Sequence, residues 1–87
     1  MDKQEQECLN RAGEAQKLMD NPLMQAFFVD LEGFLKEALW ECPVEDEKSI
    51  RDLKNKSYYL KLFRQTLENY ISMGKLIKEE INPKEGD

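Results

Sequence analysis

The fold of this chain is decided by residues 46–81, which read DEKSIRDLKNKSYYLKLFRQTLENYISMGKLIKEEI. One set of residues recurs there every seven positions, and a second set follows three residues after its members. The first set is Leu53, Leu60, Leu67, Gly74 and Ile81, and the second is Lys56, Phe63, Tyr70 and Ile77. This is the a/d heptad pattern of a helix that packs along a seam. Since no proline interrupts the stretch, we expect one helix about 54 Å long at 1.5 Å per residue.

Residues 22–41 carry more apolar surface than one neighbouring helix can cover. One stripe at helical spacing comprises Met24, Phe27, Leu31, Phe34 and Ala38, and a second comprises Phe28, Leu35, Leu39 and Cys42, with Leu23 and Trp40 nearby. Together they exceed the roughly 100° arc that a helix buries in a two-layer packing. A hairpin partner covers only one stripe, which favours self-association. The alternative is a monomeric three-helix core in which residues 2–19 fold back over the second stripe.

Prolines divide the chain into three helical segments. Asn21-Pro22 separates a first helix over 2–19 from the helix over 22–41, and Pro43 ends that second helix. Asp46 is a suitable N-cap for the third helix, over 46–81, which Asn82-Pro83 ends. Because short connections join antiparallel neighbours, the second and third helices should form a hairpin.

We therefore predict an all-α fold. It consists of an antiparallel helical hairpin with a long C-terminal helix, a short extra N-terminal helix and coiled-coil-like packing. The chain should form a single small domain, 1–87, because 87 residues supply only one modest core. Residues 82–87 should form a flexible polar tail.

Composition indicates a folded helical protein of the cytoplasm. Charged residues make up 36% of the chain and mean hydropathy is -0.75, but 40% of residues are hydrophobic and fall at helical spacing. No apolar run is long enough to span a membrane, and the first residues do not resemble a signal peptide. Cys8 and Cys42 lack a CxxC partner, so two idle thiols in a reducing cytoplasm are expected.

The sequence offers little for catalysis or metal binding. It contains no histidine, so a nucleophile would have to be Cys8 or Cys42. Burial at the end of an apolar stripe would raise the pKa of the Cys42 thiol and make it inert. The glycines are isolated, so no phosphate-binding loop is present. We expect no enzyme, no catalytic residues, no cofactor and no metal.

Charge is distributed unevenly along the chain. Residues 1–47 hold 12 acidic and 4 basic side chains, a net of -8, whereas residues 48–87 hold 6 acidic and 9 basic ones, a net of +3. One interpretation is that the acidic half lies antiparallel to the basic half, so that opposite charges set the direction of pairing. The other is that the basic stretch 48–64, with Tyr58 and Tyr59, contacts nucleic acid. A sequence pI of about 4.8 opposes that second interpretation.

Two seam positions depart from the heptad pattern. Gly74 is either a tolerated weak position or a place where another helix, or a bulky side chain such as Trp40, comes close. Lys56 either extends its amino group to solvent or specifies the register of packing.

The chain resembles small helical proteins of unknown role encoded by tailed bacteriophages and prophages. The residues that carry this resemblance lie between positions 20 and 81: Asn21-Pro22-Leu23, Trp40, Pro43, Asp46, Leu53, Leu60, Leu67-Glu68 and Gly74-Lys75-Leu76. The stretch 54–61, rich in lysine and tyrosine, and the short acidic N-terminal helix depart from it. The resemblance implies a helical hairpin in a phage or prophage setting, hence a bacterial host cytoplasm, and it implies no catalytic residues.

We expect a helical protein-interaction module that self-associates or binds another helical protein, plausible as a phage assembly or host-interaction accessory. The interface residues expected are Phe27, Phe28, Leu31, Phe34, Leu35, Leu39, Trp40, Leu53, Leu60, Phe63, Leu67, Tyr70, Gly74 and Ile77. One alternative is a nucleic-acid-associated accessory that uses Lys48, Arg51, Lys54, Lys61 and Arg64. Another is an inhibitor that mimics nucleic acid through Glu5, Glu7, Glu14, Asp30, Glu32 and Glu37.

Overall fold

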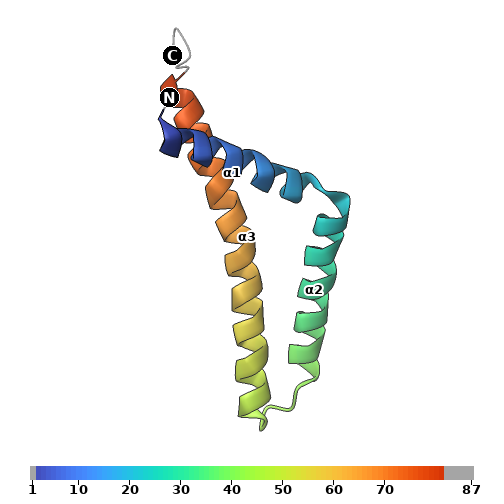
Figure 1. Ribbon diagram of the computed structural model, residues 1–87. Coiled ribbons are helices and arrows are strands. Elements are labelled where there is room, and N and C mark those ends of the chain that lie inside the picture. Colours follow the sequence, from blue (N-terminus) through green and yellow to red (C-terminus); the bar gives the residue numbers. More distant parts are fainter. Residues whose placement is uncertain (1, 82–87) are drawn as a thin grey trace. The chain divides into compact units, whose positions relative to one another are not determined.

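The computed structural model describes residues 2–81 and consists, over that range, of three α-helices without strands (Figure 1). The helices are α1 (Lys3–Asp20), α2 (Pro22–Glu41) and α3 (Glu47–Ile81). The predicted all-α class is confirmed. The expected tail at 82–87 lies outside the described residues. The described residues form two compact units, one of residues 21–64 and one that combines residues 2–20 with residues 65–81.

The break between α1 and α2 follows from local chemistry at Asn21 and Pro22. Asn21 has an extended backbone (φ -70°, ψ 121°), and its Oδ1 accepts hydrogen bonds from the backbone N–H groups of Leu23 (2.8 Å) and Met24 (3.2 Å). These are two of the donors that the first turn of a helix leaves unsatisfied. Pro22 occupies the first turn, where its missing N–H costs nothing. Asn21 is therefore the N-cap of α2.

The turn between α2 and α3 ends one helix and caps the next. Cys42 leaves the helical region (φ -71°, ψ 129°), and its N–H donates to the Leu39 carbonyl at 3.3 Å. The backbone N–H of Ser49 then donates to Asp46 Oδ1 at 3.1 Å. The predicted N-cap at Asp46 is thus observed, at the position where a carboxylate also favours the positive end of the helix dipole.

Acid should weaken this cap. Hydrogen bonds from Ser49 hold the pKa of the Asp46 carboxyl below its ordinary value of 3.8. A lowered folded-state pKa contributes stability that is fully present above the ordinary value and is lost as pH falls through the lowered one. Urea-unfolding midpoints between about pH 5 and pH 2 should therefore fall more for the wild type than for Asp46→Asn, which keeps an acceptor that does not titrate. Parallel decreases in the two proteins would contradict a titrating cap.

Residues 21–64 form an antiparallel hairpin, as predicted. α2 runs beside the N-terminal half of α3 (Figure 1). Near the start of α2, the ring of Phe28 lies 5.9 Å from the ring of Phe63. Leu35, two helical turns later in α2, lines a groove together with Leu60, which comes earlier in α3 than Phe63. Residues later in α2 thus lie beside residues earlier in α3, as in an antiparallel pair. The five-residue gap between the helices, residues 42–46, is short enough to favour this antiparallel direction.

In the other compact unit, α1 packs against the C-terminal half of α3. Gly74 of α3 lies directly against Ala12 of α1, so closely that a Cβ at position 74 would overlap the Ala12 methyl group. The Arg11 guanidinium lies 5.4 Å from the centre of the Tyr70 ring, within the range of a cation–π contact. Of the two interpretations of Gly74, the structure shows the close approach of another helix, and that helix is α1.

The helices bury few side chains. Among the described residues, the buried hydrophobic ones are Ala15, Phe28, Leu67 and Ile77. Most a positions of α3 are covered: Leu53 and Leu60 are half-buried and Leu67 and Gly74 are buried, whereas Ile81, the last residue of the helix, is 40% exposed. The d positions differ: Ile77 is buried, but Lys56, Phe63 and Tyr70 are exposed. Within the chain, most a positions of the predicted seam are therefore covered, whereas most d positions remain exposed to solvent.

Candidate protein-interaction site

One side of the hairpin presents an open apolar groove of about 460 Å³. We call this surface the apolar edge. It is lined by Phe27, Leu31 and Leu35 from α2 and by Lys56, Tyr59, Leu60 and Phe63 from α3. Its three aromatic residues are exposed to solvent: Phe27 and Phe63 are each 50% exposed, and Tyr59 is 66% exposed. An apolar concavity with exposed aromatic walls is typical of a surface that binds another protein.

The apolar edge arises because α2 has more apolar surface than α3 alone can cover. Successive residues in a helix are 100° apart, so Phe27 points about 100° away from Phe28. Phe28 enters the hairpin and is only 3% exposed, while Phe27 is left on the side, its ring edge-on to Phe28 at 5.9 Å. Phe34, seven residues after Phe27, falls on the same side of α2 and is 68% exposed. The predicted surplus of apolar surface thus lies on one flank of the hairpin.

Lys56 is the one charged residue that lines the apolar edge. Its Nζ forms an ion pair with Asp52 Oδ2 at 3.1 Å, one turn earlier on α3, and the side chain is 60% exposed. Such an exposed pair adds little stability. The arrangement instead keeps the ammonium group hydrated, while the aliphatic part of the side chain adds to the apolar surface.

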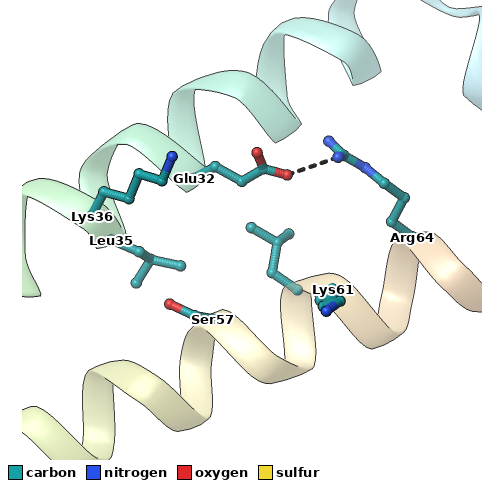
Figure 2. Close-up of a pocket in the computed structure, with 7 residues that line it drawn as sticks. Glu32, Leu35, Lys36, Ser57, Lys61 and Arg64 are labelled. Atoms are coloured by element: carbon teal, nitrogen blue, oxygen red, sulfur yellow. Dashed lines mark ion pairs between the residues drawn. The ribbon is translucent and has the colours of Figure 1, made fainter.

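The opposite side of the hairpin carries a polar groove of about 350 Å³ (Figure 2). We call this surface the polar edge. Its lining residues are Glu32, Leu35 and Lys36 from α2 and Ser57, Leu60, Lys61 and Arg64 from α3. Figure 2 shows Glu32 and Arg64 reaching toward each other across the groove, and their ion pair measures 2.9 Å.

Arg64 connects the polar edge to the hairpin core. Its guanidinium carbon lies 4.6 Å from the centre of the buried Phe28 ring, so the group pairs with the Glu32 carboxylate and covers an aromatic face. Stacking of this kind suits the planar guanidinium better than a lysine ammonium. Arg64 was among the candidate nucleic-acid contacts, and in the structure it connects the two helices of the hairpin.

The remaining expected interface residues fall into three environments. Leu39 and Leu53 are half-buried in the hairpin, and Trp40 is 89% exposed. Leu67, Gly74 and Ile77 are buried, and Tyr70 lies beneath Arg11. Tyr59 is the groove residue that was not expected. Its position three residues after Lys56 and four before Phe63 would have revealed it, because residues at that spacing share a helix face.

The other basic candidates line different hollows of the hairpin. Lys48 and Arg51 line one hollow of α3, and Arg51 and Lys54 line a neighbouring one, each shared with acidic and amide side chains. Lys61 lies on the polar edge. Beside them Tyr58 and Tyr59 pack edge to face, with ring centres 5.7 Å apart.

Two of the six carboxylates considered for nucleic-acid mimicry are paired within the chain. Glu32 binds Arg64, and Glu14 pairs with Lys17 at 3.2 Å on the surface of α1. The other four, Glu5, Glu7, Asp30 and Glu37, are distributed over α1 and α2.

The cysteines are free and half-buried. Partial burial, and secondarily the Asp46 carboxylate, raise the pKa of the Cys42 thiol, in the direction expected from the sequence. Residues 2–81 contain no group of three or more cysteine, aspartate or glutamate side chains placed to hold a metal ion. Within the same range no helix is both long and apolar enough to cross a bilayer.

No protein-family model, curated protein or solved structure matches this chain. Its function is therefore inferred from the surfaces of the hairpin.

Proposed function

We propose that this chain is a non-enzymatic helical interaction module that self-associates through the apolar edge. The observation that carries the proposal is the open groove in which Phe27, Tyr59 and Phe63 are each at least half exposed. Water contact of this much aromatic surface is unfavourable, and the surface lies along the half of the α3 seam that the chain leaves open. A further helix laid along it would complete the a/d packing that the heptads encode.

Self-association should depend on Tyr59 and not on its neighbour Tyr58. The two residues are adjacent, of the same type and similarly exposed, at 66% and 60%, but only Tyr59 lines the groove. Tyr59→Asp should weaken association by about 30-fold, the effect of losing one central aromatic contact worth about 2 kcal/mol. Tyr58→Asp, which makes the same charge change, should leave it nearly unaffected. Sedimentation equilibrium over micromolar concentrations measures both.

Two results would reject the proposal. The first is a wild-type protein that sediments as a monomer throughout the micromolar range. The second is an equal effect of the two tyrosine substitutions, which would mean that association does not use the apolar edge. Circular dichroism of each variant confirms that the helices remain folded.

Contact with nucleic acid and nucleic-acid mimicry stay predictions from sequence. Arg64 is engaged with Glu32 and Phe28, which weakens the case for a free basic face. The phage or prophage setting likewise stays a prediction. A protein partner is favoured because the groove of the apolar edge is lined almost wholly by carbon.

A further inference from the structure

We infer that the occupant of the apolar edge is a second copy of this chain, related by a twofold axis parallel to the hairpin helices. In this arrangement α2 of each copy lies against the N-terminal half of α3 of the other, and the two hairpins form an antiparallel four-helix bundle. The inference rests on the proposed function and adds to it the symmetry and the orientation of the two copies. Two features carry it, area and charge, and the register of the two copies then follows from the axis.

The exposed area matches the requirement of a dimer. Phe27, Phe34, Tyr59 and Phe63 lie on this side of the hairpin and are 50, 68, 66 and 50% exposed. Since a fully buried aromatic side chain hides about 150–250 Å², these four still expose on the order of 500 Å². Two copies together would then bury on the order of 1,000 Å², the lower limit of a specific interface, from the aromatic residues alone. A twofold contact uses the same patch on both partners, so one apolar edge is sufficient.

The charges of the two helices select the orientation. α2 carries four carboxylates, Asp30, Glu32, Glu37 and Glu41, against Lys36, a net charge of -3. Residues 47–64 of α3 carry six basic and two acidic side chains, a net charge of +4. A twofold axis running across the hairpin would place α2 on α2 and α3 on α3, which opposes like charges. An axis parallel to the helices places each α2 on an α3 of opposite sign. Charge complementarity of this kind sets partner orientation more than affinity.

The register follows from the same axis. Rotation about an axis parallel to the helices leaves every residue at its own height along the bundle. Within one hairpin, the Phe28 and Phe63 rings lie 5.9 Å apart, and Leu35, Tyr59 and Leu60 line the same groove. Phe34, next to Leu35 on α2, therefore lies within about one helical turn of the height of Tyr59 on α3. The inference predicts that Phe34 of one copy faces Tyr59 of the second copy.

Disulfide cross-linking between copies tests this contact. Both natural cysteines are first replaced, by Cys8→Ser and Cys42→Ser. Two single-cysteine variants are then made in this background, Phe34→Cys and Tyr59→Cys. They are mixed at a concentration where sedimentation shows dimers and are then oxidised. The expected main product is the mixed disulfide, several-fold more abundant than either homodimeric disulfide and recognised by its mass. A mixture of Lys36→Cys and Lys61→Cys, on the polar edge, is the matched control and should yield no intermolecular disulfide.

Each of the other outcomes overturns one part of the inferred dimer: its orientation, its interface or its existence. Efficient cross-linking of Phe34→Cys with itself would show that α2 lies on α2 and would overturn the orientation while leaving self-association through the apolar edge. Dimers that give no disulfide at either position would overturn the interface assigned here. Monomers throughout would overturn the proposed function as well, and the occupant of the groove would then be a different protein.

Discussion

Replacement of Phe28 by alanine is expected to lower the free energy of unfolding by about 3–5 kcal/mol, the usual range for a buried phenylalanine. The ring is 3% exposed, the rings of Phe27 and Phe63 each lie 5.9 Å away, and the Arg64 guanidinium carbon lies 4.6 Å from its centre. Removing the ring leaves a cavity at the one buried side chain of residues 21–64. It also removes the surface on which Arg64 rests.

The matched control is Phe34→Ala, the same substitution six residues later on the same helix. Phe34 is 68% exposed, so unfolding of the dilute protein should change by no more than about 0.5 kcal/mol. Urea unfolding followed by circular dichroism measures both variants. Similar losses for the two variants would show that Phe28 is not the centre of the hairpin. A loss at Phe34 that grows with protein concentration would instead report on the associated state.

The helices could be predicted from sequence because their determinants are local. Pro22, Pro43 and Asp46 mark helix ends by removing a donor or supplying an acceptor, and each lies at a boundary in the structure. The expected ranges, 2–19, 22–41 and 46–81, differ from the observed helices by at most one residue at each end. Antiparallel pairing of α2 and α3 also followed from local information, since the connection is too short for another direction.

The division of the apolar residues between core and surface could not be predicted in the same way. Phe27 and Phe28 are adjacent and identical, and spacing alone does not tell which of their two stripes α3 covers. The structure shows that Phe28 is covered and Phe27 is not. The same limit applies to α3, where most a and d positions are apolar but mainly the a positions are covered within the chain.

The contact of Arg64 with Glu32 and Phe28 could not be predicted from the sequence for a different reason. It connects residues more than 30 positions apart, and its partners differ in chemical type, so no periodic pattern reveals it. Sequence reasoning grouped Arg64 with the other bases of α3 by charge alone. Its position on the inner side of the helix, four residues after Leu60, was the available signal, because residues four apart share a helix face.

Replacement of Gly74 by alanine is expected to separate α1 from α3. The new Cβ would overlap the Cβ of Ala12, which is attached directly to the backbone and cannot rotate away. Overpacking of this kind costs about 1–3 kcal/mol, more than the roughly 1 kcal/mol that alanine gains over glycine in a helix interior. Most of the stability of a helix such as α1, 18 residues long, comes from packing against its neighbour. Far-UV circular dichroism should therefore lose part of the signal of α1, which supplies 18 of the 73 helical residues described.

Two further variants separate this steric effect from helix propensity. Gly13→Ala, in α1 itself, adds a methyl group with no neighbour within 4 Å, so it should stabilise the protein by up to about 1 kcal/mol. The double variant Ala12→Gly with Gly74→Ala exchanges the two residues across the contact, and it should recover most of the stability lost by Gly74→Ala alone. The resulting coupling energy, measured by hydrogen exchange of α1 amides and by urea unfolding, should be of order 1 kcal/mol or more. Additive effects would mean that the methyl groups at positions 12 and 74 do not meet, and that α1 is held to α3 by other contacts.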